Sequence, residues 1–153
     1  FLTLFAVGKI KYAPGSIASL ITCFIFFVLE NYLSTINFLI IVSAIFFYSF
    51  YAINNSFEYF QSDDPQEIVI DEFVGQALPL LAIPIYETLF STSKVYYFVS
   101  AFLIFRFFDI LKPFPINYLD RNIEGALGIM IDDIVAGFFT IFILCIIFFF
   151  LGG

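Results

Sequence analysis

The sequence predicts an all-α, polytopic integral membrane domain, with about five hydrophobic helices and the polar motif loops gathered on one face. Composition supports this prediction, since 62% of the residues are hydrophobic and only 12% are charged. In soluble domains roughly 45–50% of the residues are apolar and about 25% are charged. The mean hydropathy is +1.04. No polar linker divides the chain, so residues 1–153 are expected to form a single domain.

Two apolar segments are long enough to cross a bilayer, which takes about 20 residues. They are residues 36–53 and 134–151, and neither contains a charge. Three weaker segments are expected at residues 15–29, 73–90 and 95–111. The first of the three is short for a full crossing. Pro79 and Pro84 should kink or break the segment that contains them.

The charged loops fall on one side of the membrane if all five segments cross it. These loops are residues 1–14, 54–72 and 112–133. They contain most of the basic residues, namely Lys9, Lys11, Lys112 and Arg121, whereas Lys94 alone lies on the opposite side. Because cytoplasmic loops carry an excess of Lys and Arg, we expect this face to be cytoplasmic.

The residue types that the chain lacks exclude several enzyme classes. It has no histidine, which excludes histidine-nucleophile phosphatases, Ser-His-Asp hydrolases and histidine-ligated zinc enzymes. Cys23 and Cys145 lie in apolar runs without an arginine six positions later, so they predict packing rather than cysteine-phosphatase chemistry. We expect no nucleic-acid partner and make no prediction of oligomeric state.

The carboxylates concentrate in three stretches of the sequence. They are residues 63–76, 105–116 and 128–139. Acids beside an apolar run are usually solvated helix ends, and we interpret Asp120 and Glu124 in this way. Four other aspartates have large apolar neighbours on both sides: Asp71, Asp109, Asp132 and Asp133. An ionisable group in such surroundings costs free energy unless it is paired, and is by default a functional candidate.

Spacing predicts how these charges group if the stretches are helical. Arg106, Asp109 and Lys112 follow one another at steps of three and would share one face. Glu67 and Asp71 would share another. In the first and third stretches a glycine follows a carboxylate by one turn, at Gly75 after Asp71 and at Gly137 after Asp133. A glycine in that position lets a neighbouring helix approach closely.

Several carboxylates at one depth repel one another and raise one another's pKa unless a cation neutralises them. Oxygen-only ligands favour a hard divalent ion, and Mg²⁺, which also binds phosphate oxygens, suits such a site. Arg106 and Lys112 flank Asp109 and are placed to hold an anionic substrate group against the metal. We therefore expect metal-assisted attack on a phosphoryl group, with the attacking group, water or carboxylate, left open.

Two other functions share parts of this pattern. Intramembrane acids also line cation pathways, so a membrane cation transporter or channel component that uses the acidic cluster as an ion site stays the alternative. A phosphotransferase that joins a nucleotide-activated lipid to an alcohol needs further aspartates at fixed spacing. No acid follows Asp133, which excludes this second rival.

Four motifs closely resemble the phosphatidylglycerophosphatase A family. They are "APGSIAS" (13–19), "DDPQEIVIDEFVG" (63–75), "FRFFDILKPFPI" (105–116) and "GIMIDDIVAG" (128–137), in the order typical of the family. The resemblance implies an all-helical, multi-pass enzyme of the bacterial inner (cytoplasmic) membrane. It also implies a phosphoric monoester hydrolase that uses Mg²⁺ to convert phosphatidylglycerophosphate to phosphatidylglycerol, with the active site facing the cytoplasm.

The resemblance also assigns roles to individual residues. Catalytic roles fall on Asp71, Asp109, Asp133, Arg106 and Lys112. Metal-binding roles fall on Asp71, Glu72, Asp109, Asp132 and Asp133. Substrate-binding roles fall on Asp64, Arg106 and Lys112.

The loop that contains Pro14 and Gly15 has two compatible roles. Ser16 after this pair predicts a turn and a helix N-cap. A helix start beside Lys9 and Lys11 is also a natural anion site. We therefore add Lys9, Lys11 and Ser16 to the substrate-binding candidates.

Overall fold

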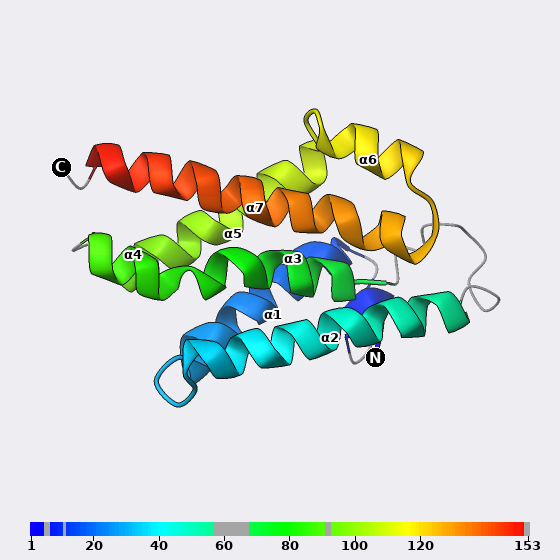
Figure 1. Ribbon diagram of the computed structural model, residues 1–153, viewed down its shortest axis with the longest axis horizontal. Helices are drawn as coiled ribbons and strands as arrows, with labels where there is room; N and C mark the ends of the chain where they lie inside the picture. The colour runs from blue at the N-terminus through cyan, green and yellow to red at the C-terminus, as the bar shows by residue number, and fades with distance from the viewer. Residues whose placement is uncertain (5–6, 11, 57–67, 91–92, 152–153) are drawn as a thin grey trace.

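The computed structural model describes all residues except 5–6, 11, 57–67, 91–92 and 152–153 (Figure 1). In that part of the chain it contains seven α-helices, one short 3-10 helix and no strand, which confirms the all-α prediction. The elements are η1 (Val7–Lys9), α1 (Pro14–Leu29), α2 (Thr35–Ser56), α3 (Ile70–Leu81), α4 (Ile83–Leu89), α5 (Lys94–Leu111), α6 (Ile116–Asn122) and α7 (Gly125–Leu151).

The five predicted apolar segments correspond to α1, α2, the pair α3 and α4, α5, and α7. Figure 1 shows that the chain direction alternates from each segment to the next along the long axis. Two stretches, Thr35–Asn55 and Gly125–Phe150, are long and apolar enough to cross a membrane, with mean hydropathies of 2.1 and 2.6. Helix α1 is a shorter apolar helix.

The third segment is broken, as its two prolines predict. Pro79 lies inside α3, whereas the break falls at Ala82 and Pro84 lies in the first turn of α4. Proline has no amide hydrogen and clashes with the carbonyl four residues earlier, which prevents a continuous helix through Pro84. The Tyr97 hydroxyl donates a hydrogen bond to the Pro79 carbonyl at 2.6 Å and ties α5 to this break.

The prediction that residues 112–133 form a single loop is wrong, because most of them are helical. Residues Ile116–Asn122 form the short helix α6, and α7 begins at Gly125, well before the apolar segment 134–151. Hydropathy delimits that segment by its charges. Asp132 and Asp133 do not end the helix, however, because they are buried among other elements of the protein.

Helix α3 lies at the centre and packs against α1, α2, α5 and α7. Its crossing with α7 is close because two glycines face each other there. A Cβ on Gly75 would lie 2.7 Å from the Asp133 carbonyl oxygen, and a Cβ on Gly137 would lie 2.6 Å from the Gly75 carbonyl oxygen. The glycine spacing therefore correctly predicts a close helix approach, and this approach brings the carboxylates of the two helices together.

Candidate active site

A polar cavity of about 580 Å³ opens where α1, α3 and α7 begin and α5 ends. It is lined by Ala13, Pro14, Gly15, Ile68, Asp71, Glu72, Arg106, Asp109, Lys112, Asp120, Ile123, Glu124, Gly125, Gly128, Ile129, Asp132 and Asp133. Ala13 and Lys112, with φ of 47° and 41°, adopt the left-handed conformation that is uncommon for residues other than glycine. Of the three non-glycine residues with a positive φ in the described part of the chain, these two border the cavity and Leu4 does not. Such conformations concentrate at functional sites.

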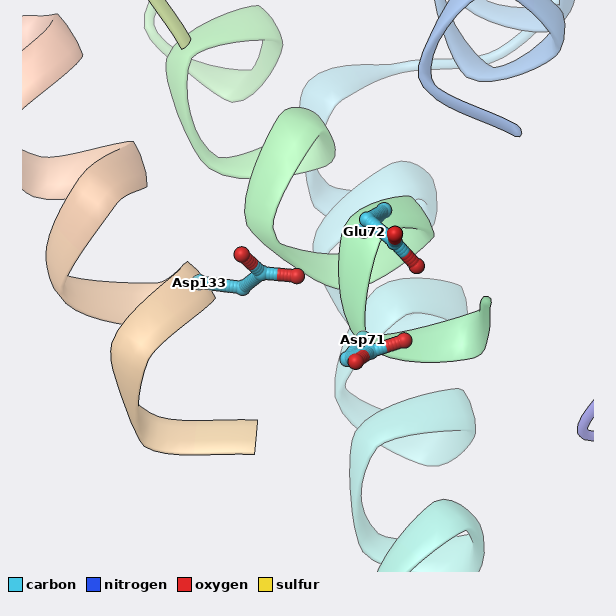
Figure 2. A group of neighbouring side chains, drawn as sticks. All are labelled: Asp71, Glu72 and Asp133. Carbon is cyan, nitrogen blue, oxygen red and sulfur yellow. The ribbon is translucent and has the colours of Figure 1, made fainter. Parts of the chain in front are cut away.

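Three carboxylates converge inside this cavity. One ligand atom each from Asp71, Glu72 and Asp133 lies within 4.8 Å of the other two (Figure 2). Asp71 and Glu72 occupy the first turn of α3, and Asp133 comes from α7. The close crossing at Gly75 and Gly137 lies one turn further along both helices, so it fixes the separation of these side chains.

Several carboxylate oxygens of the cavity are buried without a hydrogen-bond partner among the described residues. They are Asp71 Oδ1, Glu72 Oε2 and Asp132 Oδ1. Asp71 and Glu72 come directly before the apolar segment 73–90 and so lie outside the stretch expected to cross the membrane. Burial, and then the neighbouring Glu72 carboxylate, raise the pKa of Asp71 well above its ordinary value. Burial also raises the pKa of Glu72. A cation among these oxygens would offset both the burial and the mutual repulsion.

Arg106 lines the cavity from α5 and contacts α1. Its guanidinium forms an ion pair with Asp109, three residues along the same helix, as the spacing predicts. Arg106 Nη1 also donates to Ser19 Oγ at 3.5 Å. Gly15 makes room for this arrangement, because a Cβ there would overlap the Glu72 carboxylate and lie 3.2 Å from Arg106 Nη1.

Lys112 does not continue the column formed by Arg106 and Asp109, which corrects the prediction that the three share a helix face. Helix α5 ends at Leu111, and the left-handed Lys112 turns its side chain toward α6 and α7. Its Nζ lies 2.5 Å from Asp120 Oδ1 and 2.7 Å from Asp132 Oδ2. Burial alone would lower the pKa of Lys112, but these two contacts raise it above its ordinary value, so the ammonium stays charged.

The structure brings most of the predicted site residues to one cavity. Those that line it are Asp71, Glu72, Arg106, Asp109, Lys112, Asp132 and Asp133. Lys9 is exposed, and neither it nor Ser16 is among the lining residues. Lys11, Asp64 and Glu67 lie outside the described residues. The N-cap prediction for Ser16 is wrong, because Ala13 is the N-cap and Pro14 opens the helix.

Three polar residues of the site are not predicted from the sequence. Asp120 and Glu124, interpreted above as solvated helix ends, both line the cavity, and Asp120 pairs with Lys112. The turn between α5 and α6 brings this pair together, and no simple spacing rule predicts it. Ser19, which accepts from Arg106 and donates to the Gly15 carbonyl at 3.0 Å, follows Gly15 by one helical turn. That spacing, and its place at the end of the motif "APGSIAS", are the signals that could have identified it.

Comparison with known proteins identifies the family of this chain. The family model for phosphatidylglycerophosphatase A matches residues 1–148. A phosphatidylglycerophosphatase A of Haemophilus influenzae is 37% identical over 139 residues, which cover 91% of this chain and 81% of that protein.

Two further relatives extend the comparison. A phosphatidylglycerophosphatase A of Escherichia coli is 46% identical over 74 residues, 48% of this chain and 39% of that protein. A Bacteroides thetaiotaomicron protein, provisionally named a phosphatidylinositol-3-phosphatase, is 31% identical over 147 residues, 94% of this chain and 89% of that protein. No solved structure matches. The chain therefore belongs to the phosphatidylglycerophosphatase A family.

Proposed function

We propose that the chain hydrolyses the terminal phosphomonoester of phosphatidylglycerophosphate, releasing phosphate and phosphatidylglycerol. Family membership and the names of two relatives supply the substrate. The observation that carries the proposal is the cavity itself, in which the carboxylates of Asp71, Glu72 and Asp133 lie together and Arg106 and Lys112 line the same space. The relative named for a phosphoinositide substrate would act on the same kind of bond, a phosphomonoester on a lipid headgroup.

The residues of the cavity fit a magnesium ion. The buried oxygens of Asp71, Glu72 and Asp132 have no partner among the described residues, and these donors are all hard oxygen atoms, which Mg²⁺ prefers. We assign Asp71, Glu72 and Asp133 as its ligands, with Asp109 and Asp132 as further candidates. When bound, Mg²⁺ neutralises the carboxylates and polarises a phosphoryl oxygen.

The basic residues bind and orient the phosphate. Arg106 has a buried Nε without a hydrogen-bond partner among the described residues, so its planar guanidinium retains a donor for a phosphate oxygen. Lys112 is held by Asp120 and Asp132 and adds a fixed positive charge at another wall. In hydrolysis the oxygen of water forms a bond to phosphorus while the bond between phosphorus and the glycerol oxygen breaks. A cavity carboxylate accepts the proton that the water loses, and the leaving glycerol oxygen takes up a proton to become the hydroxyl group of phosphatidylglycerol.

The first experiment measures phosphate release. Purified protein in detergent is incubated with phosphatidylglycerophosphate in the presence of Mg²⁺ or of a chelator. We expect release with Mg²⁺ and none with chelator. Equal release in both would refute the metal-assisted mechanism, and no release in either would refute the substrate assignment.

We further infer that all five apolar segments cross the bacterial inner membrane and that the cavity faces the cytoplasm. The alternating chain direction and the clustering of Arg106 and Lys112 at the cavity end, with Lys94 at the other, support this orientation. Single cysteines at positions 124 and 32, in a cysteine-free background, provide the test. Labelling of position 124 from the periplasmic side would overturn the orientation.

The alternative of a cation transporter or channel finds no support. The comparisons give phosphatases only. The buried acids of the cavity gather at one end of the bundle, and the long helix α2 carries no charged residue along Thr35–Ser56. A pathway for ions would need polar groups at successive depths.

A further inference from the structure

A second depression, entirely apolar, runs between α1 and α5. It encloses about 560 Å³ and is lined by Leu20, Ile21, Cys23, Phe24, Phe27, Val95, Phe98, Val99, Phe102 and Leu103. We refer to it as the α1/α5 groove. Several of its wall residues are exposed, including Phe24 and Val99, so the groove opens sideways from the bundle. Bulk lipid and a second protein chain are rival occupants that the test below separates.

The groove lies next to the polar cavity along α1 and α5. Arg106 lines the cavity and contacts Ser19 across the same two helices. Leu20 follows Ser19 directly, and Leu103 lies one helical turn before Arg106. The cavity and the groove share no lining residue, but they lie beside each other along α1 and α5. A molecule with its charged end beside Arg106 would therefore reach the groove with an apolar extension along these two helices.

The dimensions of the groove suit part of one lipid tail. Residues 95–103 span about 12 Å at a rise of about 1.5 Å per residue. One leaflet of hydrocarbon is about 15 Å deep, half of a bilayer core of about 30 Å. Toward the far end Phe27 and Phe98 meet edge to face across the two helices, with ring centroids 5.3 Å apart.

We propose that the α1/α5 groove holds one acyl chain of the lipid substrate while its terminal phosphate occupies the polar cavity. This inference rests on the proposed function. Lipid tails are as apolar as the groove walls, so the groove adds little affinity over the surrounding bilayer. Its contribution is to orient the lipid, so that the headgroup enters the cavity from the side, near Arg106.

Photolabelling tests where the tail lies. The probe is a non-hydrolysable phosphonate analogue of phosphatidylglycerophosphate with a diazirine partway along one acyl chain, and phosphatidylcholine with the same labelled chain is the control. We expect the analogue to label residues 20–27 and 95–103 preferentially. Equal labelling by the two lipids would identify ordinary lipid contact, and labelling confined to other helices would also overturn the proposal.

A variant that fills the groove provides the functional test. Val99→Trp places an indole in the groove about 10 Å along α5 from Arg106, and Ile40→Trp places one on the exposed face of α2 as a control. We compare phosphatidylglycerophosphate with two long (dipalmitoyl) or two short (dibutanoyl) acyl chains. We expect Val99→Trp to lower kcat/KM at least tenfold for the dipalmitoyl substrate and to leave kcat/KM for the dibutanoyl substrate within twofold of the wild-type value. Ile40→Trp should change neither.

Three other results of these experiments would each contradict a different part of the proposal. If Val99→Trp and Ile40→Trp affect both substrates equally, the groove proposal is wrong although the phosphatase stands. A wild-type protein that hydrolyses neither substrate would refute the proposed function itself. A dimer that Val99→Trp converts to a monomer would identify the groove as a contact between subunits and overturn the lipid assignment.

Discussion

The two ends of the helical bundle both carry charged side chains, but they hold them differently. At the far end Lys94 Nζ contacts Glu87 at 2.8 Å and Glu30 at 3.3 Å, and the side chains of Lys94, Glu87 and Glu30 are 42%, 41% and 15% exposed. At the cavity end Asp132 and Asp133 are 6% and 3% exposed as whole residues. Burial together with an excess of one charge, rather than charge alone, distinguishes the functional end.

Packing determines why the cavity end buries more of its charged side chains than the far end does. At the far end large rings fill the space between helices, with Tyr86 centred 4.4 Å from Tyr97 and 4.6 Å from Phe148. At the cavity end glycines replace them, and Gly75 and Gly137 let the backbones of α3 and α7 approach. The cavity lies beside this close approach, near the starts of α3 and α7, and the short acidic side chains of both helices line it.

The largest expected effect at the cavity end comes from removing one of the converging carboxylates. Asp133→Asn keeps the size of the side chain but removes a negative ligand, so metal binding weakens and turnover should be abolished. Asp109→Asn should have the same outcome. Phosphate release measures the effect, and circular dichroism verifies the fold. Near-native activity of either variant at ordinary Mg²⁺ would show that the residue is not required.

Arg106→Lys sharpens the comparison, because it changes geometry without changing charge. Lysine loses the planar fork that binds two phosphate oxygens, and a charge-assisted contact is lost. We expect kcat to fall roughly 10- to 100-fold, with a smaller change in KM, if the contact strengthens in the transition state. Wild-type kcat and KM would instead show that Arg106 only balances Asp109.

Gly15→Ala should have an intermediate effect on activity, because it displaces neighbouring side chains without changing any charge. The added methyl group would overlap the Glu72 carboxylate and crowd Arg106, so both side chains must shift. We expect about a tenfold loss of kcat/KM, since a misplacement of about 1 Å can cost up to about 100-fold.

Ser16→Ala is the matched control for this variant, because Ser16 adjoins Gly15 but does not line the cavity. Its steady-state kinetics should equal those of the wild type. A loss of affinity for substrate in Ser16→Ala would support the predicted role of Ser16 in substrate binding.

The sequence predicts the helical segments well because a long apolar run without charge must satisfy its backbone polar groups internally, which a helix does. The break at Pro84 and the close approach at Gly75 also follow from single residues whose backbone chemistry is restrictive or permissive. Hydropathy misplaces the start of α7 because it treats Asp132 and Asp133 as a boundary. Burial inside a cavity is a tertiary property that a hydropathy window does not contain.

The predicted site is less complete for side chains whose position depends on turns. The column of Arg106 and Asp109 follows from helical spacing and is confirmed. Lys112 departs from it because the helix ends one residue earlier, and its partner Asp120 is supplied by α6. Pairings across a non-helical turn depend on backbone angles such as the positive φ of Lys112, which residue spacing alone does not predict.

The smallest expected effects come from two similar ion pairs, one at each end of the bundle. Glu87→Gln removes one partner of Lys94, and Asp120→Asn removes one partner of Lys112. Because both pairs are partly exposed, each change should alter the free energy of unfolding by no more than about 1 kcal/mol, measured by thermal unfolding in detergent.

Activity should nevertheless separate the two variants. Glu87→Gln should retain full turnover, because Lys94 keeps Glu30 and no residue of the cavity contacts the far end through this pair. Asp120→Asn should raise KM severalfold, because Lys112 then has only Asp132 to hold its ammonium against the phosphate. Equal activity of the two variants would mean that the position of Lys112 does not matter to the substrate. A loss of turnover in Glu87→Gln would mean that the far end takes part in the reaction, and the contrast between the two ends would then be wrong.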